Sequence, residues 1–188
     1  MGNFFESIYS LVTKHEAWTN DAYGYYSNYF VSENAFMWAF ISMLAIGSIA
    51  ACIYYFGFCN GTSNKYAKPS YWLITMAVVG ILAFALGKLC FIGSDSSNDS
   101  GDSNASGFYK SCEVYCQMKV DENDGNEDIQ NAIRESYNDI VENLNQGVDI
   151  VAKFQLVNLI LSLLTFFIIS MLVKNFTKHG SSIPFKLF

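Results

Sequence analysis

The chain has 188 residues, 52% of them hydrophobic, and a formal net charge of −6 at pH 7. It carries only 11 basic residues without a basic patch, which excludes nucleic acid as a partner. The apolar residues lie in three long runs, and this distribution predicts an integral membrane protein rather than a soluble domain.

Residues 1–34 are predicted to form an amphipathic segment on the outer side of the membrane. Its apolar positions follow helical spacing: Phe4, Phe5, Ile8, Leu11, Val12 and His15. Lys14 is the one basic anchor in this stretch, so we expect the segment to pack against protein rather than lie flat on the membrane surface.

Aromatic residues gather beside the two ends of the first apolar run. Tyr23, Tyr25, Tyr26, Tyr29 and Phe30 precede it, and Tyr54, Tyr55, Tyr71 and Trp72 lie toward the other face. Such positions are typical of the aromatic belts found at membrane–water interfaces. The alternative is that the first group packs beneath the outer domain.

The three apolar runs cover residues 35–58, 71–92 and 154–173. A helix needs about 20 residues to cross a hydrocarbon core about 30 Å thick. The predicted fold class is therefore an all-α integral membrane protein with three transmembrane helices.

The basic residues predict the orientation, because short cytoplasmic loops are enriched in Lys and Arg. Residues 59–70 contain Lys65 and Lys68, and residues 174–188 contain Lys174, Lys178 and Lys186, with no acid in either. Three spans place both segments on one side, which gives an N-outside, C-inside topology. The small size and the lack of eukaryotic targeting signals favour the bacterial cytoplasmic (inner) membrane, with the acidic region outside.

Charges near the outer interface are a second feature of the spans. Lys88 lies inside the second run but close to its outer end, where its amine reaches the headgroups at little cost. The alternative is an ion pair with Glu33 or Asp149.

The long outer loop begins with a flexible polar linker, residues 93–107, which offers little to bury. Residues 108–126 follow as a segment with local packing and an acidic turn. Cys112 and Cys116 are a candidate disulfide on the oxidising side, with free thiols as the alternative. The acidic turn departs from the calcium-loop pattern, and we expect no metal site.

Residues 127–153 are predicted to form an outer amphipathic helix. One contact stripe runs along it: Ile129, Ile133, Tyr137, Ile140, Leu144, Val148 and Val151. Continued to Asn175, the helix is about 73 Å long at 1.5 Å per residue, of which about 30 Å lies in the bilayer and the rest forms a stalk. A kink at Gly147 would interrupt it. The stripe needs a cover, which is the N-terminal helix, a second copy or another protein.

The third span has a polar face at helical spacing, made of Gln155, Asn158, Ser162 and Thr165. Small residues recur in the first two spans, including Gly47 and Gly80. Such surfaces allow close helix approach and hydrogen bonding across the contact. This face is expected to meet protein or water rather than lipid.

The sequence carries no catalytic motif and no set of ligands for a cofactor or metal, so we expect no enzymatic activity. The first hypothesis is a non-catalytic subunit of a larger multi-protein envelope assembly of the secretion, transport or motor type. Its partners are membrane lipid and other membrane-protein subunits or copies of itself. One alternative is a self-assembling homo-oligomeric pore of the holin or defence type, lined by the polar face. A second is a membrane immunity or inhibitor protein.

Overall fold

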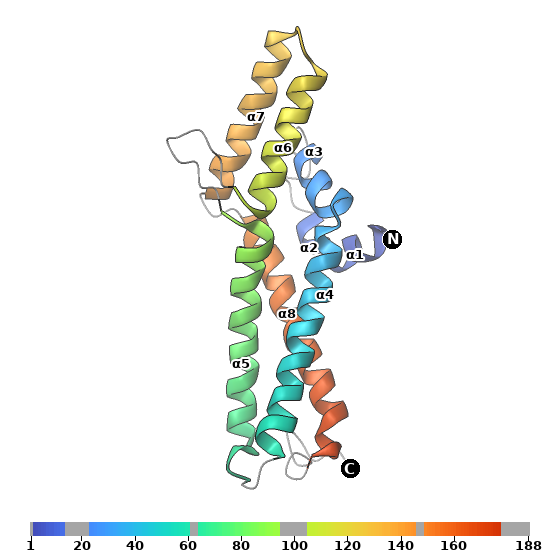
Figure 1. Cartoon of the computed structure of the whole chain (residues 1–188), viewed down its shortest axis with the longest axis vertical. Coiled ribbons are helices and arrows are strands. Elements are labelled where there is room, and N and C mark those ends of the chain that lie inside the picture. Colours follow the sequence, from blue (N-terminus) through green and yellow to red (C-terminus); the bar gives the residue numbers. More distant parts are fainter. Residues whose placement is uncertain (1, 14–22, 61–63, 95–104, 146–148, 178–188) are drawn as a thin grey trace. The chain divides into compact units, whose positions relative to one another are not determined.

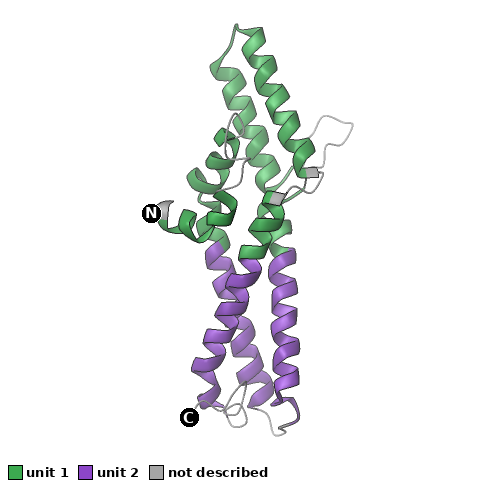
Figure 2. Cartoon of the chain, turned by 180° about the vertical axis from the view of Figure 1, so that it is seen from behind, with its two compact units in different colours: residues 1–39, 86–157 green, residues 40–85, 158–188 purple. Residues whose placement is uncertain are grey.

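The computed structural model describes residues 2–13, 23–60, 64–94, 105–145 and 149–177. Within these ranges the chain forms helices and turns without a strand, which confirms the predicted all-α class (Figure 1). The chain divides into two compact units (Figure 2). Unit 1 comprises residues 1–39 and 86–157, and unit 2 comprises residues 40–85 and 158–188.

Three helices are long and apolar enough to cross a membrane, as predicted. The first is α4 (Ala35–Cys52), extended by a π-helical stretch over Ile53–Cys59. The second is α5 (Pro69–Leu86), extended by a π-helical stretch over Gly87–Ile92. The third is α8 (Asp149–Val173), which ends in a 3-10 turn over Lys174–Phe176.

Local sequence explains where these spans begin and end. Asn34 precedes α4 with a φ of 59°, a left-handed conformation that asparagine tolerates better than most residues. Pro69 opens α5, because a first-turn residue needs no N–H donor. Gly93 follows the second span with a φ of 79° and leads the chain out of the helix.

The segment after the second span folds into a helical hairpin of α6 (Gly107–Glu122) and α7 (Glu127–Asn145) (Figure 1). The Asn126 side chain caps α7, since its Oδ1 accepts a hydrogen bond from the Ile129 N–H at 3.3 Å. Gln130 Nε2 donates to the carbonyl oxygens of Val120 and Asn123, each at 3.3 Å. These bonds hold the start of α7 against the end of α6.

The helix α6 was not predicted as such. Its buried side chains recur at helical intervals, namely Phe108, Cys112, Cys116 and Val120. This spacing of four residues can be read in the sequence. The polar stretches on either side leave it too short to stand out as a helix. The predicted Cys-containing segment is therefore a regular helix that pairs with α7.

Aromatic rings form the core of unit 1. The N-terminal elements are α1 (Gly2–Ile8), α2 (Ser10–Thr13) and α3 (Tyr23–Ser27), and a π-helical stretch follows over Asn28–Ser32. Phe30 stacks on Phe36 with ring centroids 4.7 Å apart, and its ring also lies 5.4 Å from Phe108 and 5.5 Å from Phe154. This cluster joins the start of α6 to the starts of α4 and α8.

The predicted aromatic belt is therefore wrong at most of its positions. Tyr25, Tyr26, Tyr29 and Phe30 are buried in unit 1, and only Tyr23 of that group is exposed. In unit 2, Tyr54, Tyr55 and Trp72 are buried in a core with Ala51, Val79 and Phe166. Rings whose polar atoms find partners within the protein pack inside it instead of facing the headgroups.

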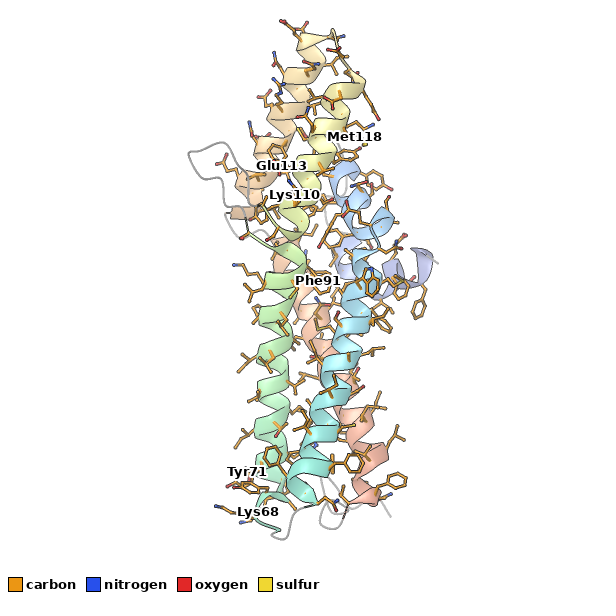
Figure 3. The ribbon with its side chains drawn as sticks, in the orientation of Figure 1. Lys68, Tyr71, Phe91, Lys110, Glu113 and Met118 are labelled. Atoms are coloured by element: carbon orange, nitrogen blue, oxygen red, sulfur yellow. The ribbon has the colours of Figure 1, made fainter. Side chains whose placement is uncertain are left out.

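Two hydrogen bonds show how the unit 2 rings are satisfied. The Trp72 indole N–H donates to Ser170 Oγ at 3.2 Å, and the Tyr54 hydroxyl lies 3.0 Å from the Tyr66 carbonyl oxygen. Tyr71, labelled in Figure 3, keeps its ring partly exposed beside Tyr66, with centroids 5.3 Å apart.

The ends of the predicted linker are joined to each other. Ser106 N–H donates to the Ser94 carbonyl oxygen, and Ser94 N–H donates to Ser106 Oγ, both at 3.1 Å. Gly107, with a φ of 58°, lies close to the end of the second span, because a Cβ added to it would lie 2.7 Å from the Phe91 carbonyl oxygen. We call this pair of bonds the serine clasp. Residues 95–104 lie outside the described residues.

The predicted stalk crosses another such gap. The helix α7 ends at Asn145 and α8 begins at Asp149. Gly147 and Val148 lie outside the described residues, so a continuous helix and a kink at Gly147 both remain predictions.

Candidate functional site

The contact stripe of α7 changes character along its length. Ile140 and Leu144 are buried, at 4% and 6% exposure, whereas Ile129 is 43% exposed. Val151, the last residue of the predicted stripe, lies on α8 and is buried at 9% exposure. Ile133 and Tyr137 lie between these extremes. The half of the stripe nearest the hairpin turn is therefore open, and the other half is covered.

The open half lines a groove of about 480 Å³ within unit 1. Its residues come from α3, α6 and α7: Tyr25, Tyr115, Lys119, Asp128, Ile129, Ala132, Ile133 and Ser136. A volume of this size holds a few side chains of a docked segment or a small molecule. We refer to it as the hairpin groove.

Two tyrosines make one wall of the hairpin groove. The rings of Tyr25 and Tyr115 meet edge to face with centroids 4.8 Å apart. The Tyr25 hydroxyl donates a hydrogen bond to the Ile133 carbonyl oxygen at 3.3 Å. Gly24 admits Tyr115, because a Cβ at this position would lie 2.5 Å from the phenol oxygen. Aromatic walls of this kind are common at contact surfaces.

Both signs of charge border the hairpin groove. Lys119 Nζ lies 5.7 Å from the Tyr115 ring centroid and 2.7 Å from Glu122 Oε2. The hydrogen bond and charge of Glu122 raise the pKa of Lys119, so its amine stays protonated at neutral pH. Asp128, in the first turn of α7, is exposed on the other helix. An incoming segment therefore meets an apolar floor between a cation and an anion.

The apolar surface continues onto α6 beside the groove. Val114 is 55% exposed and Met118 is 43% exposed, one helical turn apart. Figure 3 marks Met118 on this helix, together with Lys110 and Glu113, which form an ion pair at 3.0 Å. Exposed apolar side chains rimmed by charges are typical of protein contact surfaces.

Glu33 is held by polar side chains rather than by Lys88, the alternative partner considered from the sequence. Its Oε1 accepts hydrogen bonds from Ser111 Oγ at 2.7 Å and Asn28 Nδ2 at 3.0 Å. Lys88 is exposed and has no ion-pair partner among the described residues. Nothing is described of the Asp149 side chain. The bonds to Glu33 tie the approach to α4 to the first turns of α6.

Cys112 and Cys116 are free thiols on consecutive turns of α6. Burial raises the pKa of both, and the nearby Glu33 carboxylate adds to the effect on Cys112. The candidate disulfide is thus absent from the structure, and a spacing of four residues on a regular helix is marginal for a bridge, near the upper end of the allowed Cα separation. Thiols that stay protonated behave as small apolar groups here.

The polar face of the third span is buried. Gln155 and Thr165 are 5% and 8% exposed, and Asn158 and Ser162 are fully buried. In unit 2 this face meets Gly47 of α4, where an added Cβ would lie 2.7 Å from the Ser162 carbonyl oxygen and 2.8 Å from Thr165 Cβ. The close approach that small residues allow is therefore made within the chain.

The comparisons with known proteins give no family. No protein-family model matches the chain, and no curated protein or solved structure is significantly similar to it.

Proposed function

We propose that this chain is a non-catalytic integral membrane subunit of a larger multi-protein envelope assembly, and that its α6–α7 hairpin is the surface that binds the partner. The observation that carries this proposal is the open half of the contact stripe. Ile129 and Ile133 line a groove with aromatic walls instead of being covered by the chain itself.

The partner that best fits the hairpin groove is an amphipathic helix of another subunit. Its apolar side chains would fill the space between Tyr115 and Ile129, and its charges would face Lys119 and Asp128. This is the helix-in-groove mode of recognition, in which residues one turn apart anchor a helix. Val114 and Met118 extend the contact area beyond the groove.

The proposed setting is the bacterial cytoplasmic membrane in an N-outside, C-inside orientation. The support is the pair of basic segments, residues 59–70 and 174–188, which fall on one side of three spans. In this orientation the hairpin and its acidic residues face outward, where a partner in the envelope reaches them.

A self-assembling pore is less well supported. It needs the polar face of the third span to line a water-filled conduit between copies, yet Ser162 and Thr165 pack against Gly47 of the same chain. A membrane immunity protein would use the same groove, and the identity of the bound partner separates that role from an assembly subunit.

The test is site-specific photocrosslinking in native membranes. A photoreactive residue at Ile129 or Ser136 faces the groove, whereas exposed Asn131 and Asn138 lie on the side of α7 away from it. The proposal expects one adduct of the same mass from both groove positions, with none from the two controls. Leu144 is unsuitable because it is buried.

A matched pair of substitutions shows whether the groove itself binds. Ala132→Trp fills the groove and is expected to abolish the adduct. Asn131→Trp, at the preceding residue, is expected to leave the adduct unchanged. Adducts between two differently tagged copies would identify the partner as a second copy of this chain rather than another subunit. The same adducts from groove and control positions would contradict the proposal.

A further inference from the structure

The N-terminal elements α1 and α2 have two unlike faces. Tyr9 and Val12 are fully buried, whereas Phe4 is 60% exposed and Leu11 is 51% exposed. The buried pair holds the segment on unit 1. Phe4 and Leu11 are therefore two large apolar side chains with about half or more of their surface exposed.

The aromatic contacts of Tyr9 fix the depth of this segment along the spans. Its ring stacks on Phe36 with centroids 4.7 Å apart and on Phe154 with centroids 5.4 Å apart. Phe36 is the second residue of the span Ala35–Cys59, and Phe154 is the fifth of the span Ile150–Phe176. At 1.5 Å per residue, both rings lie within about 6 Å of the span ends.

That depth is the interface between the hydrocarbon core and the headgroups. Interfacial helices bury their apolar faces about 5–10 Å into this boundary. Trp38, two residues after Phe36, is 56% exposed on the same part of α4. Tryptophan is enriched at this level of the membrane, so an exposed indole there agrees with lipid beside it.

We infer that α1 and α2 form an interfacial anchor, in which Phe4 and Leu11 insert into the headgroup–acyl boundary while Tyr9 and Val12 hold the segment on the span ends. The ligand is a neutral phospholipid surface. Glu6 is the one charged residue among residues 2–13, so insertion depends on apolar burial rather than on attraction to anionic lipid.

This division of faces revises the expectation from the sequence. The N-terminal segment does pack against protein, because Val12 is fully buried and Tyr9 stacks on Phe36 and Phe154 at the span ends. Phe4 and Leu11 keep more than half of their surface exposed, which is the surface that lipid would contact. The inference does not depend on the proposed function, because it concerns another surface and another partner.

The test places a small fluorescent amino acid at position 4 or position 11 of the full chain in phosphatidylcholine liposomes. Two matched positions serve as controls. Val114 is a similarly exposed residue on α6, outside the spans, and Ile81, 69% exposed, lies near the middle of the second span. Quenchers are nitroxides attached to lipid at a shallow or a deep acyl position, and iodide in the water.

The inference expects shallow nitroxide to quench positions 4 and 11 about threefold more strongly than position 114, and deep nitroxide to act most on position 81. Adding anionic lipid leaves the pattern unchanged. Quenching of positions 4 and 11 by iodide alone would place this face in water. Protection from both lipid and iodide would show that protein covers it, and either outcome overturns the anchor.

Discussion

The Tyr25 hydroxyl donates a hydrogen bond to the carbonyl oxygen of Ile133, 3.3 Å away and 108 residues further along the chain. It joins α3 to the helix that carries the contact stripe. The bond lies at the edge of the hairpin groove, so it bears on both the stability of the hairpin and the shape of the groove.

Tyr25→Phe removes this donor and keeps the ring. We expect the stability of α7 near Ile133 to fall by about 0.5–1.5 kcal/mol, the usual net value of one hydrogen bond. Amide hydrogen exchange of the reconstituted protein measures this change. Val114→Ala, on an exposed side chain of α6, is the control and is expected to stay within about 0.5 kcal/mol. Unchanged exchange around Ile133 in Tyr25→Phe would show that the bond contributes nothing.

Gly47→Ala tests the approach of α4 to α8 within unit 2. Its Cβ would meet backbone atoms, with the Ser162 carbonyl oxygen at 2.7 Å and the Phe166 nitrogen at 2.9 Å. Backbone gives way less easily than side chain, so we expect a loss of about 1–3 kcal/mol, seen as a lower midpoint of thermal unfolding in detergent.

Gly57→Ala is the matched control for that substitution. The nearest atom to its Cβ is Ile53 Cγ2 at 4.0 Å, which is ordinary contact. We expect no loss of stability, and a small gain follows if alanine favours the helical backbone there. Equal effects of the two substitutions would mean that close packing at Gly47 has no particular importance.

Ser170→Ala removes the acceptor of the Trp72 indole N–H, which lies 3.2 Å from it in a buried site. We expect a loss of about 0.6 kcal/mol, typical of such bonds between helices in membranes. A shift of the Trp72 emission accompanies it, because the indole loses its polar neighbour. Ser42→Ala, on a half-buried serine of α4, is expected to leave that emission unchanged.

Alkaline pH is expected to destabilise unit 1. Burial, with a smaller contribution from Cys112, raises the pKa of Tyr26 from 10.0 to about 12, and burial also raises the pKa of Cys112. Above pH 10 the unfolded chain loses the Tyr26 proton while the folded chain keeps it. Stability therefore falls by about 1.4 kcal/mol per pH unit for that group until its folded pKa is reached.

Unfolding of the reconstituted protein as a function of pH measures the alkaline effect, with tyrosinate absorption as the second readout. Tyr26→Phe is expected to flatten the dependence between pH 10.0 and about 12. The contribution of the Cys112 thiol begins at lower pH, near the ordinary thiol pKa, and remains in this variant. An unchanged profile in Tyr26→Phe would contradict the assignment to this ring.

The sequence was sufficient for the three spans, because a charge-poor run of about 20 residues has few other stable structures. Their ends differ by a few residues. Pro69 starts a helix earlier than hydropathy indicates, and the third span covers Ile150–Phe176 instead of residues 154–173. Orientation depends on the cell rather than on the fold, so it stays a prediction.

The candidate site was predicted less completely. The spacing of the stripe gave no sign of which half is buried, because the burial of Ile140 and Leu144 depends on tertiary packing that the period of one helix does not contain. The aromatic belt failed for a related reason. A tyrosine beside a span has the same sequence context whether it faces headgroups or packs on Phe108, and only tertiary packing decides between them.

The serine clasp holds Ser94 and Ser106 within hydrogen-bond distance of each other, although eleven residues separate them in the sequence. The distance between the end of the second span and the start of α6 is therefore fixed by these two bonds and does not depend on the number of residues between Ser94 and Ser106. An epitope inserted there need not change the register of the helices on either side. Antibody access to it in intact cells would show which side of the membrane carries the hairpin, and thereby test the proposed orientation directly.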